Sequence, residues 1–109
     1  MMKIVLDPGH SGEFEPGACA GGVTEAEIVY RIAWFAAQEL RQRGHEVRLT
    51  RGRNIDNDEL TFRAALANEW DADLFISIHC NAAIRPSAEG TETYCFPGSA
   101  NGRKLATCL

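Results

Sequence analysis

The sequence has no long hydrophobic run. The apolar residues Ile4–Leu6 near the N-terminus end at Asp7, and no later segment approaches the length of a membrane span. A transmembrane helix needs about 20 apolar residues, and a signal peptide needs an apolar core of roughly 7–15 residues. We therefore expect neither a membrane span nor a signal peptide within this chain.

Cysteine occurs in no C-x-x-C pair, which excludes the zinc-ribbon and thioredoxin-type motifs. The four residues are Cys19, Cys80, Cys95 and Cys108. A short chain that depends on disulfides is normally much richer in cysteine. We expect four reduced thiols that behave as small apolar side chains.

The chain has no excess of positive charge. It carries 11 Lys and Arg against 15 Asp and Glu, which gives a net charge of −4. The arginines between residues 41 and 53 are typical of a helix end and a solvated strand face, so nucleic acid is not an expected partner. With 45% hydrophobic and 24% charged residues among 109, the chain has the composition and size of one globular domain.

Strand and helix patterns alternate along the chain. Strands are predicted at residues 3–6, 46–49, 74–78 and 92–96. Helices are predicted at about 24–43 and 60–67, with a last helix beginning near residue 101. Residues 9–22, 51–58 and the segment that contains Pro86 and Gly90 are predicted loops. The order β-α-β-α-β predicts the α/β class, with a mainly parallel sheet and helices on both faces.

The first helix has clear boundary signals. Thr24 and Glu27 fit a capping box at its start, and Gly44 suits its C-terminal end. Ser99 is the predicted cap of the last helix. The residues of the first helix that we expect to face the core are Ile28, Ile32, Phe35, Ala36 and Leu40.

Two histidines lie just beyond the ends of predicted strands. His10 comes after the first strand and His79 after the third, while Glu25 opens the helix between them. The carboxyl ends of parallel strands share one edge of a sheet, where ligands bind. Two imidazoles and one carboxylate are a typical ligand set for catalytic zinc, which keeps a fourth position for water. The sequence therefore predicts a zinc site of His10, Glu25 and His79.

Each of these residues also has a structural interpretation. Either histidine can be a hydrogen-bonded rim group, and Glu25 can serve only the helix dipole. Cys80 beside His79 suggests a Cys–His nucleophile, but neighbouring strand residues point to opposite faces, so we do not expect one. The loop glycines fit neither phosphate-binding fingerprint and are better explained by a turn that passes close to a metal.

These residues resemble the zinc-dependent N-acetylmuramoyl-L-alanine amidases of the amidase-3 family, found in autolysins and phage endolysins. Residues 4–12 are similar to the family's first strand and first histidine ligand, and Glu25 is similar to its glutamate ligand. Residues 77–82 are similar to its second histidine segment. Further matching segments, in the family's order, are residues 49–51, 63–68 and 90–94.

The resemblance implies a Zn²⁺ hydrolase that cleaves the amide between N-acetylmuramic acid and L-alanine in peptidoglycan. It also implies a phosphorylase/hydrolase-like α/β fold, with residues 1–109 as the N-terminal portion of the catalytic domain. The family's second, catalytic glutamate is expected beyond Leu109, so the domain is expected to be incomplete at its C-terminus and the catalytic residue stays unassigned. Asp7 is a candidate for orienting a ligand histidine, and Asn81 for contacting substrate.

Two alternatives remain at this point. The chain can be a fragment that binds peptidoglycan or zinc without turnover, or a metal-free α/β domain whose histidines are rim groups. If the protein is the enzyme, we expect it to act on the bacterial cell wall. It would be made in the cytoplasm and released by lysis or by a signal outside this sequence. The sequence does not indicate an oligomeric state.

Overall fold

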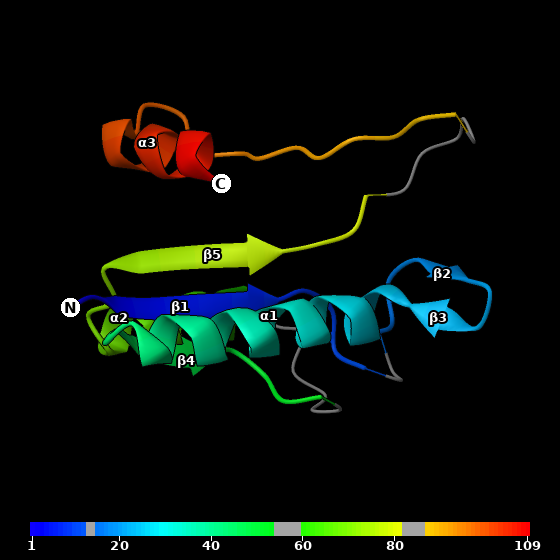
Figure 1. Cartoon of the computed structure of the whole chain (residues 1–109), viewed down its shortest axis with the longest axis horizontal. Helices are drawn as coiled ribbons and strands as arrows, with labels where there is room; N and C mark the ends of the chain where they lie inside the picture. Colours follow the sequence, from blue (N-terminus) through cyan, green and yellow to red (C-terminus); the bar gives the residue numbers. More distant parts are fainter. Residues whose placement is uncertain (13–14, 54–59, 82–86) are drawn as a thin grey trace.

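A three-stranded parallel sheet forms the centre of the molecule (Figure 1). The computed structural model describes residues 1–12, 15–53, 60–81 and 87–109. β1 (Lys3–Pro8) lies between β4 (Glu46–Leu49) and β5 (Leu74–Ile78), and both pairings are parallel. Five of the six residues of β1 are buried, as a central strand covered on both faces requires. The predicted α/β class with a parallel sheet is confirmed.

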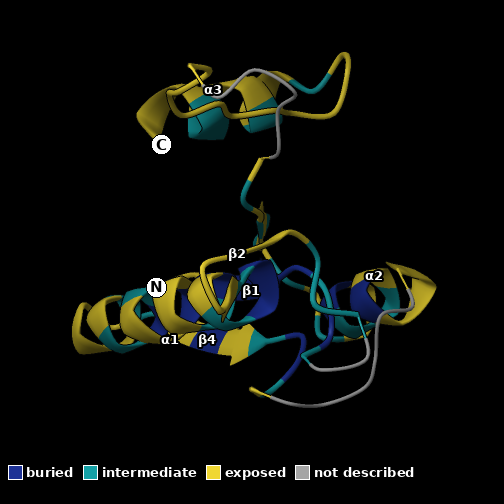
Figure 2. Ribbon diagram, turned by 90° about the vertical axis from the view of Figure 1, so that its right-hand side faces the viewer, coloured by how far each residue is buried: buried dark blue, intermediate teal, exposed yellow. Residues whose placement is uncertain are grey.

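Helices lie on both sides of this sheet (Figure 2). α1 (Glu25–Gln42) connects β1 to β4 and packs on one face, and α2 (Leu60–Glu69) connects β4 to β5 on the other. Thr24 caps α1 by accepting a hydrogen bond from the Glu27 N–H at 3.2 Å. Gly44 adopts φ +91°, the left-handed conformation expected just after a helix. The capping box is only half formed, because the Glu27 carboxylate pairs with Arg31 and Arg53.

The buried face of α1 differs from the prediction. Ile28, Ile32 and Phe35 are exposed, whereas the buried apolar residues of α1 are Ala26, Val29, Ala33 and Ala37, of which Ala33 and Ala37 pack against β1 and β4. Of the residues expected at the core, Ala36 and Leu40 do pack against it. Both stripes have helical spacing, and the small side chains of the buried one let the helix axis approach the sheet closely. Periodicity alone therefore selected the wrong stripe on a helix that is apolar on more than one side.

A short hairpin, which the sequence did not predict, overlaps the end of the predicted Gly-rich loop at residues 9–22 and continues to Thr24. β2 (Cys19–Ala20) and β3 (Val23–Thr24) pair antiparallel across Gly21 and Gly22. Both glycines have positive φ, at 58° and 77°, which a two-residue turn of this kind requires. The Gly-Gly dipeptide was the sequence signal for this hairpin. The hairpin leads directly into α1 and so fixes where that helix begins.

The predicted strand at residues 92–96 is wrong. These residues form no strand, and Tyr94 and Phe96 are each 81% exposed. A strand needs a neighbour for its hydrogen bonds, and the segment runs apart from β5, the edge of the sheet among the described residues (Figure 1). After it comes α3 (Ala100–Cys108), where Ser99 accepts from the Gly102 N–H as the sequence predicted.

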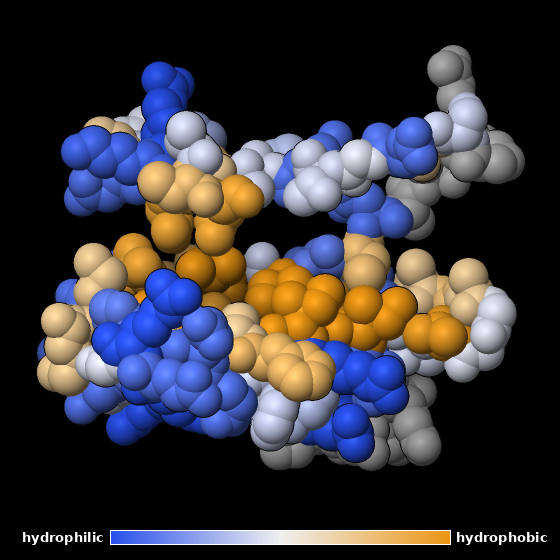
Figure 3. Space-filling view, in the orientation of Figure 1, coloured by the Kyte–Doolittle hydropathy of each residue, from blue (hydrophilic) through white to orange (hydrophobic). Residues whose placement is uncertain are grey.

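A groove of about 1370 Å³ separates β5 from residues 91–109. His79, Asn81 and Tyr94 line it together with apolar residues such as Phe75 and Leu105. Figure 3 shows hydrophobic surface on both sides of this groove. Among the described helices, none combines the length and apolar character that crossing a membrane requires. The predicted loops at residues 54–58 and at Pro86 lie outside the described residues.

Candidate metal centre

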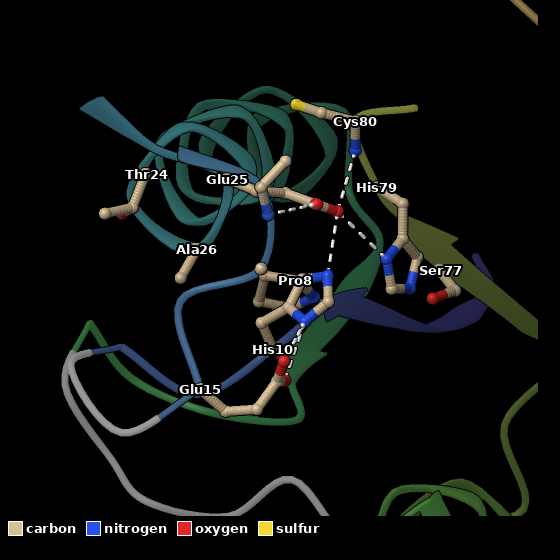
Figure 4. Close-up of polar contacts among 12 residues, drawn as sticks. Pro8, His10, Glu15, Thr24, Glu25, Ala26, Ser77, His79 and Cys80 are labelled. Atoms are coloured by element: carbon tan, nitrogen blue, oxygen red, sulfur yellow. Dashed lines mark hydrogen bonds and ion pairs between the residues drawn. The ribbon is translucent and has the colours of Figure 1, made fainter. Parts of the chain in front are cut away.

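The carboxyl ends of β1 and β5 bring the two predicted histidines to one edge of the sheet. The Gly9 N–H donates to the Ile78 carbonyl at 3.0 Å, which aligns the C-terminal ends of β1 and β5. His10 follows at φ 65°, an uncommon conformation for a residue with a side chain, and it turns the chain away from the sheet. His79 directly follows β5, and Glu25 is the first residue of α1 (Figure 4).

One carboxylate oxygen joins the two imidazoles. Glu25 Oε2 lies 2.9 Å from His10 Nε2 and 3.2 Å from His79 Nδ1. The two rings meet edge to face, with centroids 5.2 Å apart. Glu25 is 5% exposed, whereas the His10 and His79 side chains are 22% and 49% exposed. The structure therefore brings the three predicted ligands together: both histidines contact the buried Glu25 carboxylate, and both are more exposed than it is.

The Glu25 carboxylate is held in its ionised form. Burial alone raises the pKa of Glu25, because it disfavours the charge. The backbone N–H groups of Cys80 and Ala18, together with the two histidines, outweigh burial, and the pKa of Glu25 lies below its ordinary value. An ionised, buried carboxylate beside two imidazole nitrogens provides the charge that a divalent cation needs.

The geometry of these donors fits zinc. One ligand atom from each of His10, Glu25 and His79 can be chosen so that all lie within 4.8 Å of one another. Zinc bonds of about 2.0–2.2 Å in a tetrahedral arrangement place neighbouring donors roughly 3.3 Å apart. The two donor separations at Glu25 are close to that value. Small shifts of the side chains therefore suffice to accept the ion.

Two glycines form the wall of this centre. A Cβ on Gly9 would lie 2.7 Å from His79 Nε2, and one on Gly17 would lie 2.7 Å from His10 Nε2 and 2.8 Å from Glu25 Oε1. Neither position has room for a side chain. This agrees with the sequence interpretation of the loop glycines as residues that let the backbone pass close to the donors.

Asp7 does not contact either histidine through the hydrogen bonds that the structure describes. Its carboxylate accepts from Thr50 Oγ1 at 2.7 Å, from Ser77 Oγ at 2.6 Å and from Arg63 Nη1 at 2.9 Å. Arg63 Nη2 in turn donates to the His10 carbonyl at 2.6 Å. Among the contacts of the described residues, Asp7 is connected to His10 through Arg63 and the backbone. Its predicted role in orienting a ligand histidine stays a prediction.

Asn81 lies at the exposed side of the centre. Its Nδ2 donates to Glu92 Oε2 at 2.9 Å, and the Tyr94 hydroxyl donates to the same oxygen at 2.6 Å. These contacts connect the end of β5 to the segment on the far side of the groove. The predicted contact of Asn81 with substrate stays a prediction, although the residue lines the groove.

Sequence reasoning missed two structural roles next to the centre. Glu15 meets His10 Nδ1 with both carboxylate oxygens, at 2.7 and 2.8 Å. The buried Arg51 donates to the carbonyls of Pro8, Gly9 and Ala26, and so ties the end of β1 to the first turn of α1. An acid in a Gly-rich loop gives no distinctive signal, and an arginine in an Arg-rich stretch is more often on the surface.

Cys80 contributes its backbone rather than its thiol. Its N–H donates to Glu25 Oε2 at 3.0 Å. Burial, followed by the negative charge of Glu25, raises the pKa of the Cys80 thiol above its ordinary value. A raised pKa lowers the thiolate fraction, so the observation supports the expectation that Cys80 is not a nucleophile.

The molecule is an α/β domain in which helices flank a parallel β-sheet. Two histidines and a glutamate at the C-terminal edge of that sheet form a candidate metal centre. The family model of Amidase_3, N-acetylmuramoyl-L-alanine amidase, matches residues 4–109. The chain belongs to this family.

Individual relatives agree with the family assignment. The chain is 41% identical over 92 residues to the N-acetylmuramoyl-L-alanine amidase AmiC of Neisseria meningitidis, and 37% identical over 99 residues to the amidase CwlM of Bacillus licheniformis. These matches cover 84% and 90% of this chain. The solved structure of the amidase AmiC2 of Nostoc punctiforme superposes with a TM-score of 0.86 at 34% identity, over 97% of this chain.

This chain matches only part of each relative. It spans 22% of AmiC, 38% of CwlM and 57% of the AmiC2 chain. The fold and the family follow from these similarities.

Proposed function

We propose that this chain belongs to a peptidoglycan amidase of the bacterial cell wall and binds one zinc ion through His10, Glu25 and His79. The observation that carries the proposal is that His10 Nε2 and His79 Nδ1 both contact Glu25 Oε2, at 2.9 and 3.2 Å. The three residues come from separate parts of the fold. The substrate class comes from the family, whose relatives are named N-acetylmuramoyl-L-alanine amidases. The proposed reaction is hydrolysis of the amide between N-acetylmuramic acid and L-alanine.

Each residue of the centre has a separate task in this proposal. Zinc, when bound, supplies Lewis-acid polarisation of a carbonyl and lowers the pKa of a water molecule. Glu25 keeps a negative charge in a buried position, because two backbone N–H groups stabilise it. His10 and His79 present Nε2 and Nδ1, respectively, to that carboxylate. Arg51 and Arg63 fix the backbone that carries His10 through bonds to the Gly9 and His10 carbonyls.

The groove next to His79 supports a polymeric substrate. It opens beside the more exposed histidine and is lined by Asn81, Glu92 and Tyr94 as well as by apolar residues. Polar groups at the histidine end and apolar groups along the walls suit a glycan that carries a peptide stem. We therefore place the proposed substrate contact of Asn81 in this groove.

The test of this function measures zinc content and amine release separately. The purified chain is incubated with peptidoglycan, and new L-alanine amino groups are quantified with and without a chelator. Release that the chelator abolishes and added zinc restores is the expected result. Release that continues unchanged in the chelator contradicts zinc-dependent hydrolysis. A chain that binds zinc stoichiometrically but releases no amine contradicts turnover by this chain and favours binding without hydrolysis.

A further inference from the structure

The imidazole of His10 lies between two carboxylates. On one side, Nε2 faces Glu25 Oε2 at 2.9 Å, as in the candidate metal centre. On the other side, Nδ1 faces both oxygens of Glu15, at 2.7 and 2.8 Å (Figure 4). The two ring nitrogens therefore have different partners, and only one of them faces the other proposed ligands.

An ionised carboxylate accepts hydrogen bonds and donates none. His10 Nδ1 must then carry the hydrogen in its contact with Glu15. Glu25 is also an acceptor, so Nε2 can offer a lone pair on this side only where a cation is bound beside Glu25. With a cation there, a neutral imidazole that keeps its proton on Nδ1 has the Nε2 lone pair available for the ion. Glu15 thus selects the form of His10 that can donate an electron pair from the side where the donors converge.

The backbone holds Glu15 in place for this contact. The Ser11 N–H donates to the Glu15 carbonyl at 2.9 Å, which holds Glu15 beside the residue that follows His10. The next residue, Pro16, accepts from the Ala26 N–H at 3.0 Å and so connects the same segment to the first turn of α1. The position of Glu15 is therefore coupled to both His10 and the helix that carries Glu25.

The neighbouring Gly17 limits the His10 ring from another side. A Cβ at this position would lie 2.6 Å from His10 Cδ2 and 2.8 Å from Glu25 Oε1, so the backbone itself forms the wall. The His10 side chain is 22% exposed, against 49% for His79. Glu15 and Gly17 together make His10 the more tightly held histidine of the pair.

We propose that Glu15 is a positioning residue for the metal centre, which fixes His10 with its proton on Nδ1 and directs Nε2 at the ion. The inference rests on the proposed function, because it takes His10 to be a zinc ligand. Carboxylates that hold a ligand histidine in this way typically contribute about 10–100-fold to metal affinity. Glu15 touches neither the ion nor substrate in this account and acts only through His10.

The experiment compares Glu15→Ala and Glu15→Gln with the wild-type chain and with Glu39→Gln. Glu39 is an exposed helix residue paired with Arg43, so its substitution removes one negative charge away from the centre. Zinc affinity is measured by competition with a chelator. The protonation of each histidine nitrogen is read from long-range ¹H–¹⁵N spectra of the zinc-loaded proteins. Backbone amide spectra verify that each variant is folded.

We expect Glu15→Ala to lower zinc affinity by about 10–100-fold, and Glu15→Gln to lower it less because its amide oxygen still accepts from Nδ1. The control is expected to bind like wild type. In wild type, His10 is expected to show a protonated Nδ1 and a metal-bound Nε2, and this signature is expected to broaden or split in Glu15→Ala.

Two results overturn the inference in distinguishable ways. If wild type binds zinc and His10→Ala abolishes that binding, but both Glu15 variants keep wild-type affinity and an unchanged His10 signature, only the role of Glu15 is wrong. If wild type binds no zinc, the proposed metal centre is wrong and the role of Glu15 falls with it.

Discussion

The imidazole of His79 packs directly against the backbone of Gly9. A Cβ on Gly9 would lie 2.5 Å from His79 Nδ1 and 2.7 Å from Nε2, distances that real side chains do not adopt. Gly9 also donates its N–H to the Ile78 carbonyl, one residue before His79. The glycine just beyond β1 therefore bonds to the last residue of β5 and leaves the space that the His79 ring occupies.

A methyl group at Gly9 is expected to displace the His79 ring. Overpacking of this kind costs about 1–3 kcal/mol. If that cost falls on the metal-binding arrangement, Gly9→Ala lowers zinc affinity by roughly 5–150-fold. Chelator competition measures the change. The control is Gly44→Ala, which has no atom within 4 Å of its Cβ position but is strained by its φ of +91°, so it carries a backbone cost outside the metal centre. Equal zinc affinity in both variants would show that the ring does not need the space above Gly9.

The buried Asp7–Arg63 pair is expected to carry much of the stability of this edge of the sheet. The two side chains are only 6% and 4% exposed and meet at 2.9 Å. Removing one partner of a buried pair typically costs about 3–5 kcal/mol, because the other charge stays buried. We therefore expect Arg63→Met to lower the free energy of unfolding by that amount in denaturant titration.

The control for this prediction is Arg31→Met on α1. Arg31 pairs with Glu27 at 3.0 Å, but its side chain is mostly exposed, and such pairs contribute at most about 1 kcal/mol. Similar losses of stability in the two variants would argue against a special contribution from the buried pair.

The sequence was sufficient for the fold class and for the three candidate ligands. His79 directly follows β5 and His10 lies two residues beyond β1. Parallel strands end at one edge of the sheet, so the proximity of the two histidines follows from topology. The position of Glu25 follows from the cap at Thr24, which the structure confirms. These features depend on local signals and on one general rule of sheet geometry, and both are visible in a single sequence.

The features that the sequence did not reveal depend on tertiary contacts. Val29 and Ala33 face the sheet in place of Ile32, because close approach of α1 favours small side chains. Residues 92–96 have strand-like composition but no strand beside them among the described residues. The contact of Glu15 with His10 depends on the path of a loop. Neither periodicity nor residue type encodes such a path.

The exposed edge of β5 is expected to promote self-association. Phe75 on this strand is 41% exposed, and β5 has no strand on its outer side in the described part of the chain. Unpaired apolar edges are templates for pairing with other chains, and a charge placed on them blocks it. Phe75→Lys is therefore expected to weaken association by at least about tenfold, or roughly 1.4 kcal/mol, as measured by sedimentation over a concentration series.

Phe62→Lys provides the comparison for the β5 edge. Phe62 has a similar exposure, at 47%, but lies on helix α2 and not on a strand edge. If both lysine variants reduce association equally, general hydrophobicity rather than the strand edge is responsible. If neither does, the edge of β5 is not an association site.

If His10, Glu25 and His79 form one zinc site, the metal content of the chain after dialysis reports that site without an assay of activity. Zinc per chain is determined by mass spectrometry for wild type, for His10→Ala, Glu25→Gln and His79→Ala, and for His45→Ala. His45 is the matched control, since its Nδ1 accepts from the Met2 N–H at 3.0 Å, outside the centre. We expect one zinc per chain in wild type and in His45→Ala, and loss of stoichiometric zinc in the other three. Full zinc retention in any folded variant of the three, or none in wild type, would contradict it.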